Sequence, residues 1–263
     1  MFFVHDSNEQ PSRWFTELAF VLDAMKFSSP TEINVVLPYT RFARQDRKDE
    51  SRVGVSAKAV ARLISDYADR AMTVDLHVPQ MQEYFDIPFD NLYSFPSLIS
   101  YLRERHTEIL DNLVVVSPDV GGGGRVKALV KRFGRVGISA DFAIGDKTRG
   151  KPGEVDKINI IGEVSGRNCL ILDDIIDSGN TIVKTAEGLR ARGAKKVYAY
   201  GTHGLFTEGT DKFRVLDGFM ASDTLKPKQG IEVVSLIPLF GEAVYRTVVG
   251  ESLSDLFDGA RGL

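Results

Sequence analysis

One short run of the sequence, residues 170–181, carries the residue types best suited to binding chemistry. An apolar stretch leads into two adjacent carboxylates, Asp173 and Asp174, and a polar loop then precedes an amphipathic stretch. At such a helix N-terminus, free backbone N–H groups and the helix dipole stabilise an anion. The aspartates would repel a phosphate, but they suit neighbouring hydroxyls such as the 2- and 3-hydroxyls of a ribose, with or without a metal ion between. The run therefore predicts a sugar-phosphate site whose phosphate cradle comprises Asp177, Ser178, Gly179, Asn180 and Thr181.

A simpler interpretation of this run is a strand–turn–helix junction in which one Asp or Ser caps the helix. One cap would explain one of these residues. It would not explain three aspartates and two hydroxyl residues between positions 173 and 181. Dense polar loops at the carboxyl ends of strands are where open α/β sheets bind ligands, and Gly179 permits the tight backbone path of a cradle. These observations favour a binding loop.

Two polar clusters in the first third of the chain also follow apolar stretches. Residues 41–52 are rich in arginine and include Arg44 and Gln45. Guanidinium groups bind phosphate oxygens in bidentate fashion, although a solvated charged surface explains such a run equally well. His77 follows a second apolar stretch beside Asp75, and a lone histidine is more often structural than a ligand.

Two further clusters lie in the middle of the chain. Asp119 precedes a glycine run at residues 121–124, which either lets a ligand approach the backbone closely or makes a flexible turn. Lys147 and Arg149 project to the same side of an extended chain. They suit a cationic loop that closes over a transferring phosphoryl group, with a pair of solvated surface charges as the alternative. The surrounding residues 148–154 are accordingly a mobile flap or an ordinary hairpin.

Composition narrows the classes of function. The 263 residues are 43% hydrophobic and 26% charged, which is an ordinary balance for a soluble protein of one large or two modest domains. The net charge of -3 gives no support for nucleic-acid binding. The single cysteine, Cys169, excludes an intrachain disulfide and is expected to be a small buried residue. The sequence lacks a signal peptide and an apolar run of ~18 residues that could span a membrane, so we expect no membrane association and a cytoplasmic location.

Strand-like and helix-like segments must position these clusters, and they alternate along the chain. Strands are expected at residues 33–37, 71–76, 113–117, 141–144, 169–172, 196–201 and 231–235. Helices are expected at residues 56–66, 126–133, 181–192 and 241–249, with Gly193 ending the third of them. Such alternation predicts an α/β fold with mainly parallel sheets flanked by helices.

Taken together, these clusters resemble the ribose-phosphate pyrophosphokinase (phosphoribosyl-diphosphate synthetase) family. The motifs occur in order and at similar spacing along nearly the whole chain. They are Ala-Arg-Gln-Asp-Arg-Lys at 43–48, Asp-Leu-His at 75–77, Ser-Pro-Asp at 117–119, Asp-Lys with a following Arg at 146–149, Asp-Asp-Ile-Ile-Asp-Ser at 173–178 and Thr-His-Gly at 202–204. Phosphoribosyltransferases share only the motif at residues 173–181, so the resemblance to the synthetases is the specific one.

The resemblance implies a reaction and a role for each cluster. The family transfers the β,γ-diphosphoryl group of ATP to O1 of ribose 5-phosphate, giving phosphoribosyl diphosphate and AMP. Arg44, Gln45 and His77 would then contact ATP, and His77 and Asp119 would be associated with Mg²⁺. Lys147 and Arg149 would stabilise the transition state. Asp173 and Asp174 would hold the ribose hydroxyls, and residues 177–181 would hold the 5-phosphate.

The resemblance also implies an architecture. We expect two pseudo-symmetric phosphoribosyltransferase-like domains with the active site between them. Residues 1–94 with the returning tail 250–263 would form the ATP side, and residues 95–249 the ribose 5-phosphate side. The expected partners are ATP, ribose 5-phosphate and further copies of the chain, as dimers that build hexamers.

Two departures from the family pattern keep alternatives open. An N-terminal segment of several dozen residues, which completes the adenine site in the family, has no counterpart before Phe2. Asn180 stands where many relatives have a small residue, and asparagine tolerates left-handed backbone. A catalytically silent homologue that modulates an active synthetase is therefore one alternative, and a phosphoribosyltransferase is another.

Overall fold

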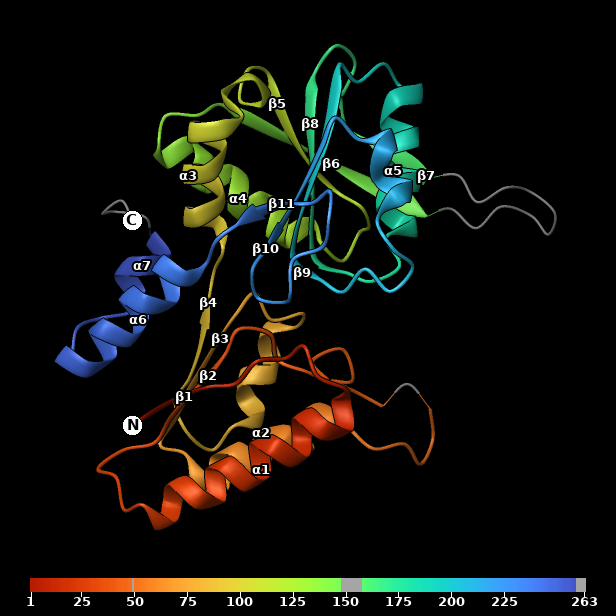
Figure 1. The fold of residues 1–263 in the computed structure, drawn as a ribbon. Coiled ribbons are helices and arrows are strands. Elements are labelled where there is room, and N and C mark those ends of the chain that lie inside the picture. The colour runs from red at the N-terminus through yellow and green to blue at the C-terminus, as the bar shows by residue number, and fades with distance from the viewer. Residues whose placement is uncertain (49, 148–157, 259–263) are drawn as a thin grey trace. The chain divides into compact units, whose positions relative to one another are not determined.

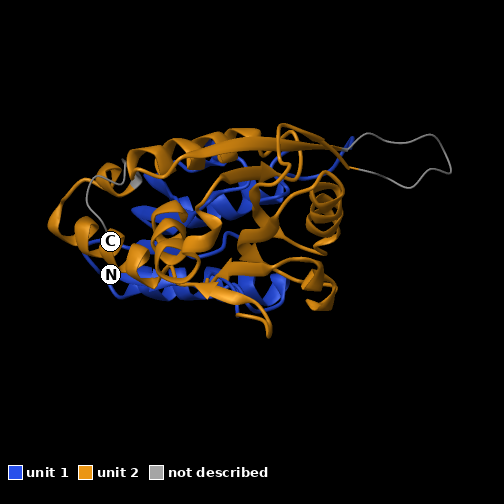
Figure 2. Ribbon diagram, turned by 90° about the horizontal axis from the view of Figure 1, so that it is seen from above, with its two compact units in different colours: residues 1–93, 224–226 blue, residues 94–223, 227–263 orange. Residues whose placement is uncertain are grey.

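The computed structural model describes residues 1–48, 50–147 and 158–258, which form two compact units (Figure 2). Unit 1 comprises Met1–Tyr93 with Thr224–Lys226, and unit 2 comprises Ser94–Asp223 with Pro227–Leu263. The first unit thus ends at Tyr93, and the described residues of the C-terminal tail group with unit 2. Arg246 fixes the tail there by donating to the Ser252 carbonyl at 2.9 Å and pairing with Asp255 at 3.5 Å. The expected domains, residues 1–94 with 250–263 and residues 95–249, stay a prediction.

Unit 1 contains a parallel four-stranded sheet in the order β1-β2-β3-β4 (Figure 1). Its strands are β1 (Phe2–Val4), β2 (Asn34–Leu37), β3 (Arg70–Val74) and β4 (Phe89–Leu92). Its helices are α1 (Pro11–Phe27), α2 (Ser56–Tyr67) and the 3-10 helix η1 (Pro79–Tyr84).

The core of unit 1 forms where α1 and α2 pack on the sheet. Proline at the first position of α1 has the backbone angle that a helix needs. The buried residues of α1 then recur every three or four positions, at Trp14, Leu18, Leu22 and Met25, and so form one stripe. This stripe belongs to one hydrophobic cluster that also contains residues of α2 and of β2.

Unit 2 contains a seven-stranded sheet in the order β11-β10-β9-β8-β5-β6-β7, parallel except for β7. Its strands are β5 (Leu113–Ser117), β6 (Ala140–Lys147), β7 (Ile158–Ile161), β8 (Asn168–Ile176), β9 (Lys196–Gly204), β10 (Gly218–Ser222) and β11 (Glu232–Val234). Its helices are α3 (Phe95–Arg105), α4 (Gly123–Arg135), α5 (Asn180–Ala191), α6 (Ile237–Val249), α7 (Ser254–Asp258) and the 3-10 helices η2 (Thr107–Ile109) and η3 (Asp211–Val215).

Helices cover both faces of the unit 2 sheet, with α3 and α4 on one side and α5 on the other (Figure 1). The predicted fold class, α/β with mainly parallel sheets flanked by helices, is confirmed. Cys169 lies in the core, as expected, and burial raises the pKa of its thiol to about 12. No helix among the described residues is long and apolar enough to cross a membrane.

A polar cluster joins the end of α3 to the unit 2 sheet. His106 contacts Glu232 through Nε2 at 2.7 Å and Glu108 through Nδ1 at 3.3 Å. Tyr101 donates to Glu232 at 2.8 Å, and Tyr198 donates to Glu108 at 3.0 Å. Burial works against a charge on His106, but the hydrogen bonds and charges of the two glutamates outweigh it and raise the pKa of the imidazole. The protonated ring therefore contributes to the stability of unit 2.

We expect His106→Gln to remove a pH-dependent part of this stability. Because the folded pKa lies above the unfolded value, the contribution is complete below about pH 6.5 and is lost as the pH rises through the folded pKa. The two glutamates are 44% and 39% exposed, so the contribution amounts to about 1 kcal/mol or less. Urea unfolding of the unmodified protein and of His106→Gln between about pH 5.5 and 8.5 measures this contribution to the free energy of unfolding. If the unfolding free energies of the two proteins differ by the same amount at every pH, the role of His106 is contradicted.

Candidate active site

The strand order of unit 2 determines where a ligand can bind. The chain leaves β5 toward β6 on one side, whereas β8 leads to β9 on the other, so the sheet changes direction between the neighbouring strands β5 and β8. Open α/β sheets bind ligands in the crevice outside the carboxyl ends of strands at such a switch point. Asp119 follows β5, and residues 173–181 end β8 and begin α5, so both lie at this edge.

Asp173 and Asp174 lie within β8, which extends to Ile176, whereas the sequence pattern placed them after the strand. Consecutive strand residues normally point to opposite faces, yet both carboxylates reach one arginine. Arg125 Nη1 lies 3.1 Å from Asp174 Oδ1 and 3.8 Å from Asp173 Oδ1. The Asp174 side chain is 4% exposed and that of Asp173 is 22% exposed. Arg125 therefore compensates two adjacent carboxylates that have little access to water.

The electrostatics of this group suit a vicinal diol. Burial raises the pKa of the Asp173 carboxyl well above its usual value, the Asp174 charge raises it further, and Arg125 opposes both. The Asp119 charge adds a smaller increase. A protonated Asp173 can donate as well as accept a hydrogen bond, and each hydroxyl of a diol also does both.

The phosphate loop, defined here as residues 177–181, has the geometry of an anion site. Gly179 precedes α5 with φ of +79°, a left-handed conformation that a side chain disfavours. A Cβ at this position would also overlap the ring of Phe213. The residue before α5, Gly179, has no side chain to cap it, and the first turn of α5 carries no acidic residue; the Asn180 N–H donates to Ser178 Oγ at 3.4 Å. The first N–H groups of α5 therefore present positive potential to an anion.

The side chains of the phosphate loop differ in their surroundings. Asp177 Oδ1 accepts a hydrogen bond from Thr207 Oγ1 at 2.7 Å. Asn180 contacts Lys212 and Glu208, at 2.8 and 3.3 Å. Asn180 is the first residue of α5, so the left-handed position belongs to Gly179 instead.

Asp119 lies at the start of the glycine run between β5 and α4. Its Oδ1 accepts a hydrogen bond from Gly122 N at 2.9 Å, and its carbonyl accepts one from Ser117 Oγ at 2.6 Å. A Cβ on Gly122 would overlap Ser117 Oγ, so a larger residue there would displace the Ser117 hydroxyl from the Asp119 carbonyl. The run thereby brings Asp119 close to the first turn of α4, which carries Arg125.

Of the two predicted catalytic cations, only Lys147 lies within the described residues. Lys147 is the last residue of β6, where it pairs with Ile158 of β7. Since β6 is parallel to β5, Lys147 lies at the same sheet edge as Asp119. Arg149 and the predicted flap at residues 148–154 lie outside the described residues.

The predicted ATP contacts belong to unit 1. Arg44 and Gln45 are exposed in the loop after β2, and His77 is exposed after β3. Because β2 and β3 are parallel neighbours, these loops leave the same edge of the sheet. Tyr84 donates from its hydroxyl to the Asp46 carbonyl, and the Gln45 carbonyl accepts the Ala57 N–H at 3.3 Å, which fixes the loop's path.

The backbone that leads to His77 is also held in a defined conformation. Asp75 adopts a left-handed backbone with φ of +44° and is buried. The Leu76 N–H donates to Asn91 Oδ1 at 3.0 Å. Leu76 is buried, and His77, the next residue, is exposed at this end of the sheet.

The side chains described above can be compared with the ligands that Mg²⁺ usually takes. Among residues 1–48, 50–147 and 158–258, no three His, Cys, Asp or Glu side chains group as a metal site. Mg²⁺, however, commonly takes one or two carboxylates and completes its shell with substrate phosphates and water. The Asp119 carboxylate fits this pattern, and the His77 imidazole suits a hydrogen bond to a phosphate oxygen or a metal-bound water.

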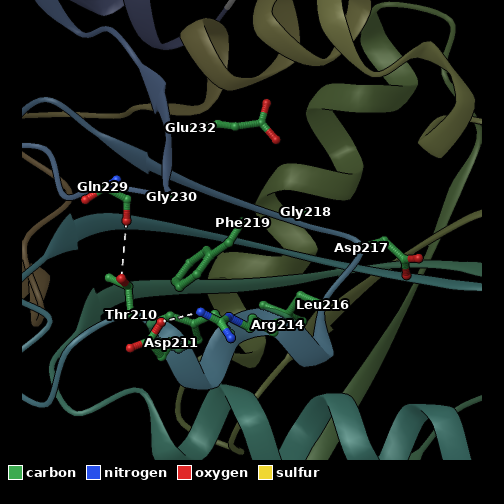
Figure 3. A pocket seen from close by; sticks show the side chains of 11 residues that line it. Thr210, Asp211, Arg214, Leu216, Asp217, Gly218, Phe219, Gln229, Gly230 and Glu232 are labelled. Carbon is green, nitrogen blue, oxygen red and sulfur yellow. Dashed lines mark hydrogen bonds and ion pairs between the residues drawn. The ribbon is translucent and has the colours of Figure 1, made fainter.

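A cavity of about 660 Å³ in unit 2 lies apart from all of these residues (Figure 3). It is lined by η3 and its neighbours and by β10 and the turn before β11. Its carboxylates already have partners, since Asp217 pairs with Arg190 at 2.6 Å and Glu232 accepts from Tyr101 and His106. Figure 3 also shows Asp211 and Arg214 paired with each other.

Comparison with known proteins identifies the family. A model of the N-terminal domain of ribose phosphate pyrophosphokinase matches residues 1–67, and one of the phosphoribosyl synthetase-associated domain matches residues 144–258. A ribose-phosphate pyrophosphokinase of Rhizobium meliloti is 42% identical over 98% of this chain and 84% of its own length. The chain belongs to the ribose-phosphate pyrophosphokinase family. The predicted family and enzyme class, ribose-phosphate diphosphokinase, are thereby confirmed.

Other members of the ribose-phosphate pyrophosphokinase family agree with this assignment. The enzyme of Mesorhizobium japonicum is 44% identical over 92% of this chain and 79% of its own length. The crystal structure of phosphoribosylpyrophosphate synthetase from Mycobacterium smegmatis superposes with a TM-score of 0.79 at 30% identity, covering 95% of this chain and 82% of that one. The family assignment therefore rests on both sequence and fold.

The unit 2 sheet brings the predicted residues Asp119, Asp173, Asp174 and the phosphate loop to one edge, and their roles in binding stay a prediction. The sequence patterns did not indicate every residue at this edge. They assigned no role to Arg125, although it follows the glycine run directly. They also gave no sign of Thr207, Glu208 and Lys212, whose approach to the phosphate loop depends on the pairing of β8 with β9.

We expect Arg125→Met to weaken ribose 5-phosphate binding by about tenfold or more at pH 7, because two poorly solvated carboxylates lose their counter-charge. The pKa of Asp173 should then rise further, so the acid limit of binding moves to higher pH. Calorimetric titration with ribose 5-phosphate across pH measures both effects.

Arg190→Met is the matched control for this experiment. Arg190 forms an ion pair of 2.6 Å with Asp217 in the same unit, at the opposite end of α5 from the phosphate loop. An Arg125→Met protein with the same affinity and pH profile as the control would exclude the role of Arg125.

Proposed function

We propose that this enzyme transfers the diphosphoryl group of ATP to O1 of ribose 5-phosphate, giving phosphoribosyl diphosphate and AMP. The observation that carries the proposal is the arrangement at the β5–β8 switch point. Two adjacent carboxylates and a helix N-terminus without an acidic first turn lie on one continuous stretch, β8 to α5. A ribose that carries a 5-phosphate has both of the groups that this stretch suits.

Each of the predicted residues has a role in this proposal. Asp173 and Asp174 hold the ribose hydroxyls, and the phosphate loop holds the 5-phosphate. Arg44, Gln45 and His77 bind ATP, and Lys147 with Arg149 neutralises charge on the transferring group. Diphosphoryl transfer depends on positioning and charge neutralisation rather than on a covalent intermediate, which fits a site rich in cations and hydrogen-bond donors.

Magnesium belongs to the same proposal. When bound, it would neutralise charge on the ATP phosphates so that O1 can approach phosphorus. Asp119 would hold it together with ATP oxygens, and His77 would orient its water or the phosphate chain. The Gly122 N–H fixes the Asp119 carboxylate in the absence of any ligand, so little reorganisation is required for this role.

We further propose that the chain acts as a cytoplasmic homo-oligomer, with dimers that build hexamers. Helix α6 supports self-association, because it exposes the apolar side chains of Ile237, Tyr245 and Val248 to 73%, 57% and 67%. Apolar groups at this spacing form one stripe along a helix, and such stripes mark protein contacts. The net charge of -3 supports neither a nucleic-acid partner nor an anionic membrane surface.

The test is production of AMP and phosphoribosyl diphosphate by the purified chain from ATP, Mg²⁺ and ribose 5-phosphate. Equal amounts of both products support the proposal. A phosphoribosyltransferase would consume phosphoribosyl diphosphate and release no AMP from ATP. A silent homologue would bind ribose 5-phosphate without turnover.

We expect Lys147→Ala to lower kcat by about 10²–10³-fold with little change in KM, because a cation that acts on the transition state contributes mainly to the chemical step. Steady-state assays with each substrate varied in turn measure this. Lys131→Ala, on exposed α4 surface, is the control and should retain full activity. An unchanged kcat in Lys147→Ala would remove Lys147 from the mechanism.

A further inference from the structure

A segment shortly after β9, residues 207–212, contacts the phosphate loop at both of its ends. At the first end, Thr207 Oγ1 donates to Asp177 Oδ1 at 2.7 Å and Thr207 N donates to the Asp177 carbonyl at 3.1 Å. At the other end, Lys212 Nζ donates to Asn180 Oδ1 at 2.8 Å. The segment, called the brace below, therefore spans the residues that flank Ser178 and Gly179.

The contact with Asn180 is a closed triangle of polar groups. Lys212 Nζ also lies 2.6 Å from Glu208 Oε2, and Asn180 Nδ2 donates to the same oxygen at 3.3 Å. Both ends of the Asn180 amide are thus engaged, its oxygen by a cation and its nitrogen by an anion. Lys212 lowers the pKa of the Glu208 carboxyl, which keeps that anion charged.

An apolar residue directly after the brace contacts the middle of the phosphate loop. Phe213 follows Lys212 in η3, and its ring occupies the space into which a Cβ on Gly179 would project. Phe213 is 5% exposed and belongs to the core of unit 2, with Phe206 and Phe219 packed against it. The left-handed turn at Gly179 is therefore supported by the core itself.

We propose that Thr207 and Lys212 are positioning residues for recognition of the phosphomonoester of ribose 5-phosphate. This inference rests on the proposed function of the phosphate loop. Backbone N–H groups bind an anion strongly only when they converge, and a loop held in that form loses less entropy on binding. Thr207 holds Asp177, and Lys212 holds Asn180, so the N–H groups between them are fixed before the phosphate arrives.

The brace acts through position rather than through added charge. Glu208 balances the charge of Lys212, so the two side chains together are neutral. The Asp177 carboxylate, which would repel a phosphate, is directed to the Thr207 hydroxyl. With Asp177 held by Thr207 and Asn180 held by Lys212 and Glu208, the phosphate would be bound by backbone N–H groups of the loop and by the hydroxyls of Ser178 and Thr181.

The chain offers a matched control for Lys212. Arg214 lies two residues further along η3 and forms an ion pair with Asp211 at 2.8 Å. Both side chains of that pair are exposed, to 84% and 93%, and Arg214 lines the cavity of Figure 3. Arg214→Met removes a cation from the same short helix without touching the phosphate loop.

The experiment measures ribose 5-phosphate binding by calorimetry and the KM of both substrates for the full chain and its variants. We expect Lys212→Met and Thr207→Val each to raise the Kd and KM for ribose 5-phosphate by about fivefold to tenfold, since each loses hydrogen bonds that hold the loop. The KM for ATP and the affinity for ribose, which lacks the phosphate, should not change. Thr207→Ser, which keeps the hydroxyl, should restore the affinity, and Arg214→Met should match the unmodified chain.

Several outcomes separate this role from a merely structural one. A general loss of stability would lower kcat through the active fraction and leave KM unchanged, which would overturn the inference. Equal ribose 5-phosphate affinity in Lys212→Met, Thr207→Val and Arg214→Met would also overturn it. If the unmodified chain binds ribose 5-phosphate but releases no AMP, the proposed function fails while the binding comparison still decides the role of the brace. If the unmodified chain does not bind ribose 5-phosphate at all, both the proposed function and the proposed role of the brace fail.

Discussion

Two consecutive carboxylates at the end of a buried strand are the feature on which the rest of unit 2 depends. Asp174 is almost fully buried, and burial and its neighbour's charge raise the pKa of Asp173. Removing one counter-charge from such a group is costly, so Arg125 must lie close to both. Arg125 meets that requirement from the first turn of α4, which follows the short glycine run after β5.

The anion site depends on a second local constraint. A helix N-terminus binds an anion only if no other anion occupies it, and the first turn of α5 carries no acidic residue. The Asp177 side chain nevertheless lies close by, and its charge would oppose a phosphate. Its hydrogen bond to Thr207 directs it toward the chain after β9. The same β8–β9 pairing that builds the sheet therefore also separates a carboxylate from the anion site.

The sequence predicted the fold class because the apolar strands and the polar loops that follow them are local patterns. The strand at residues 113–117 agrees with β5, and the helix end at Gly193 agrees with its φ of +79°. Helix α1 was not predicted, although Pro11 and the spacing of its apolar residues favour a helix. The short strands β7 and β10 lack an alternation long enough to distinguish them from loops.

The predictable part of the site differs from the rest in one physical respect. Residues 173–181 are neighbours in sequence, so their combined chemistry is visible without a structure. Arg125 and Lys212 reach the same place only through strand order, since one follows β5 and the other follows β9.

The left-handed residue illustrates the same limit. Asn180 tolerates that conformation, but Gly179 adopts it, because the space beside residue 179 is filled by Phe213 from a distant part of the chain. Glycine is thus required there by tertiary packing as well as by backbone angle. Asn180 is then free to use its amide in binding Lys212 and Glu208. Asn180, which departs from the small residue of many relatives, is therefore matched by Lys212 and Glu208 in the segment after β9.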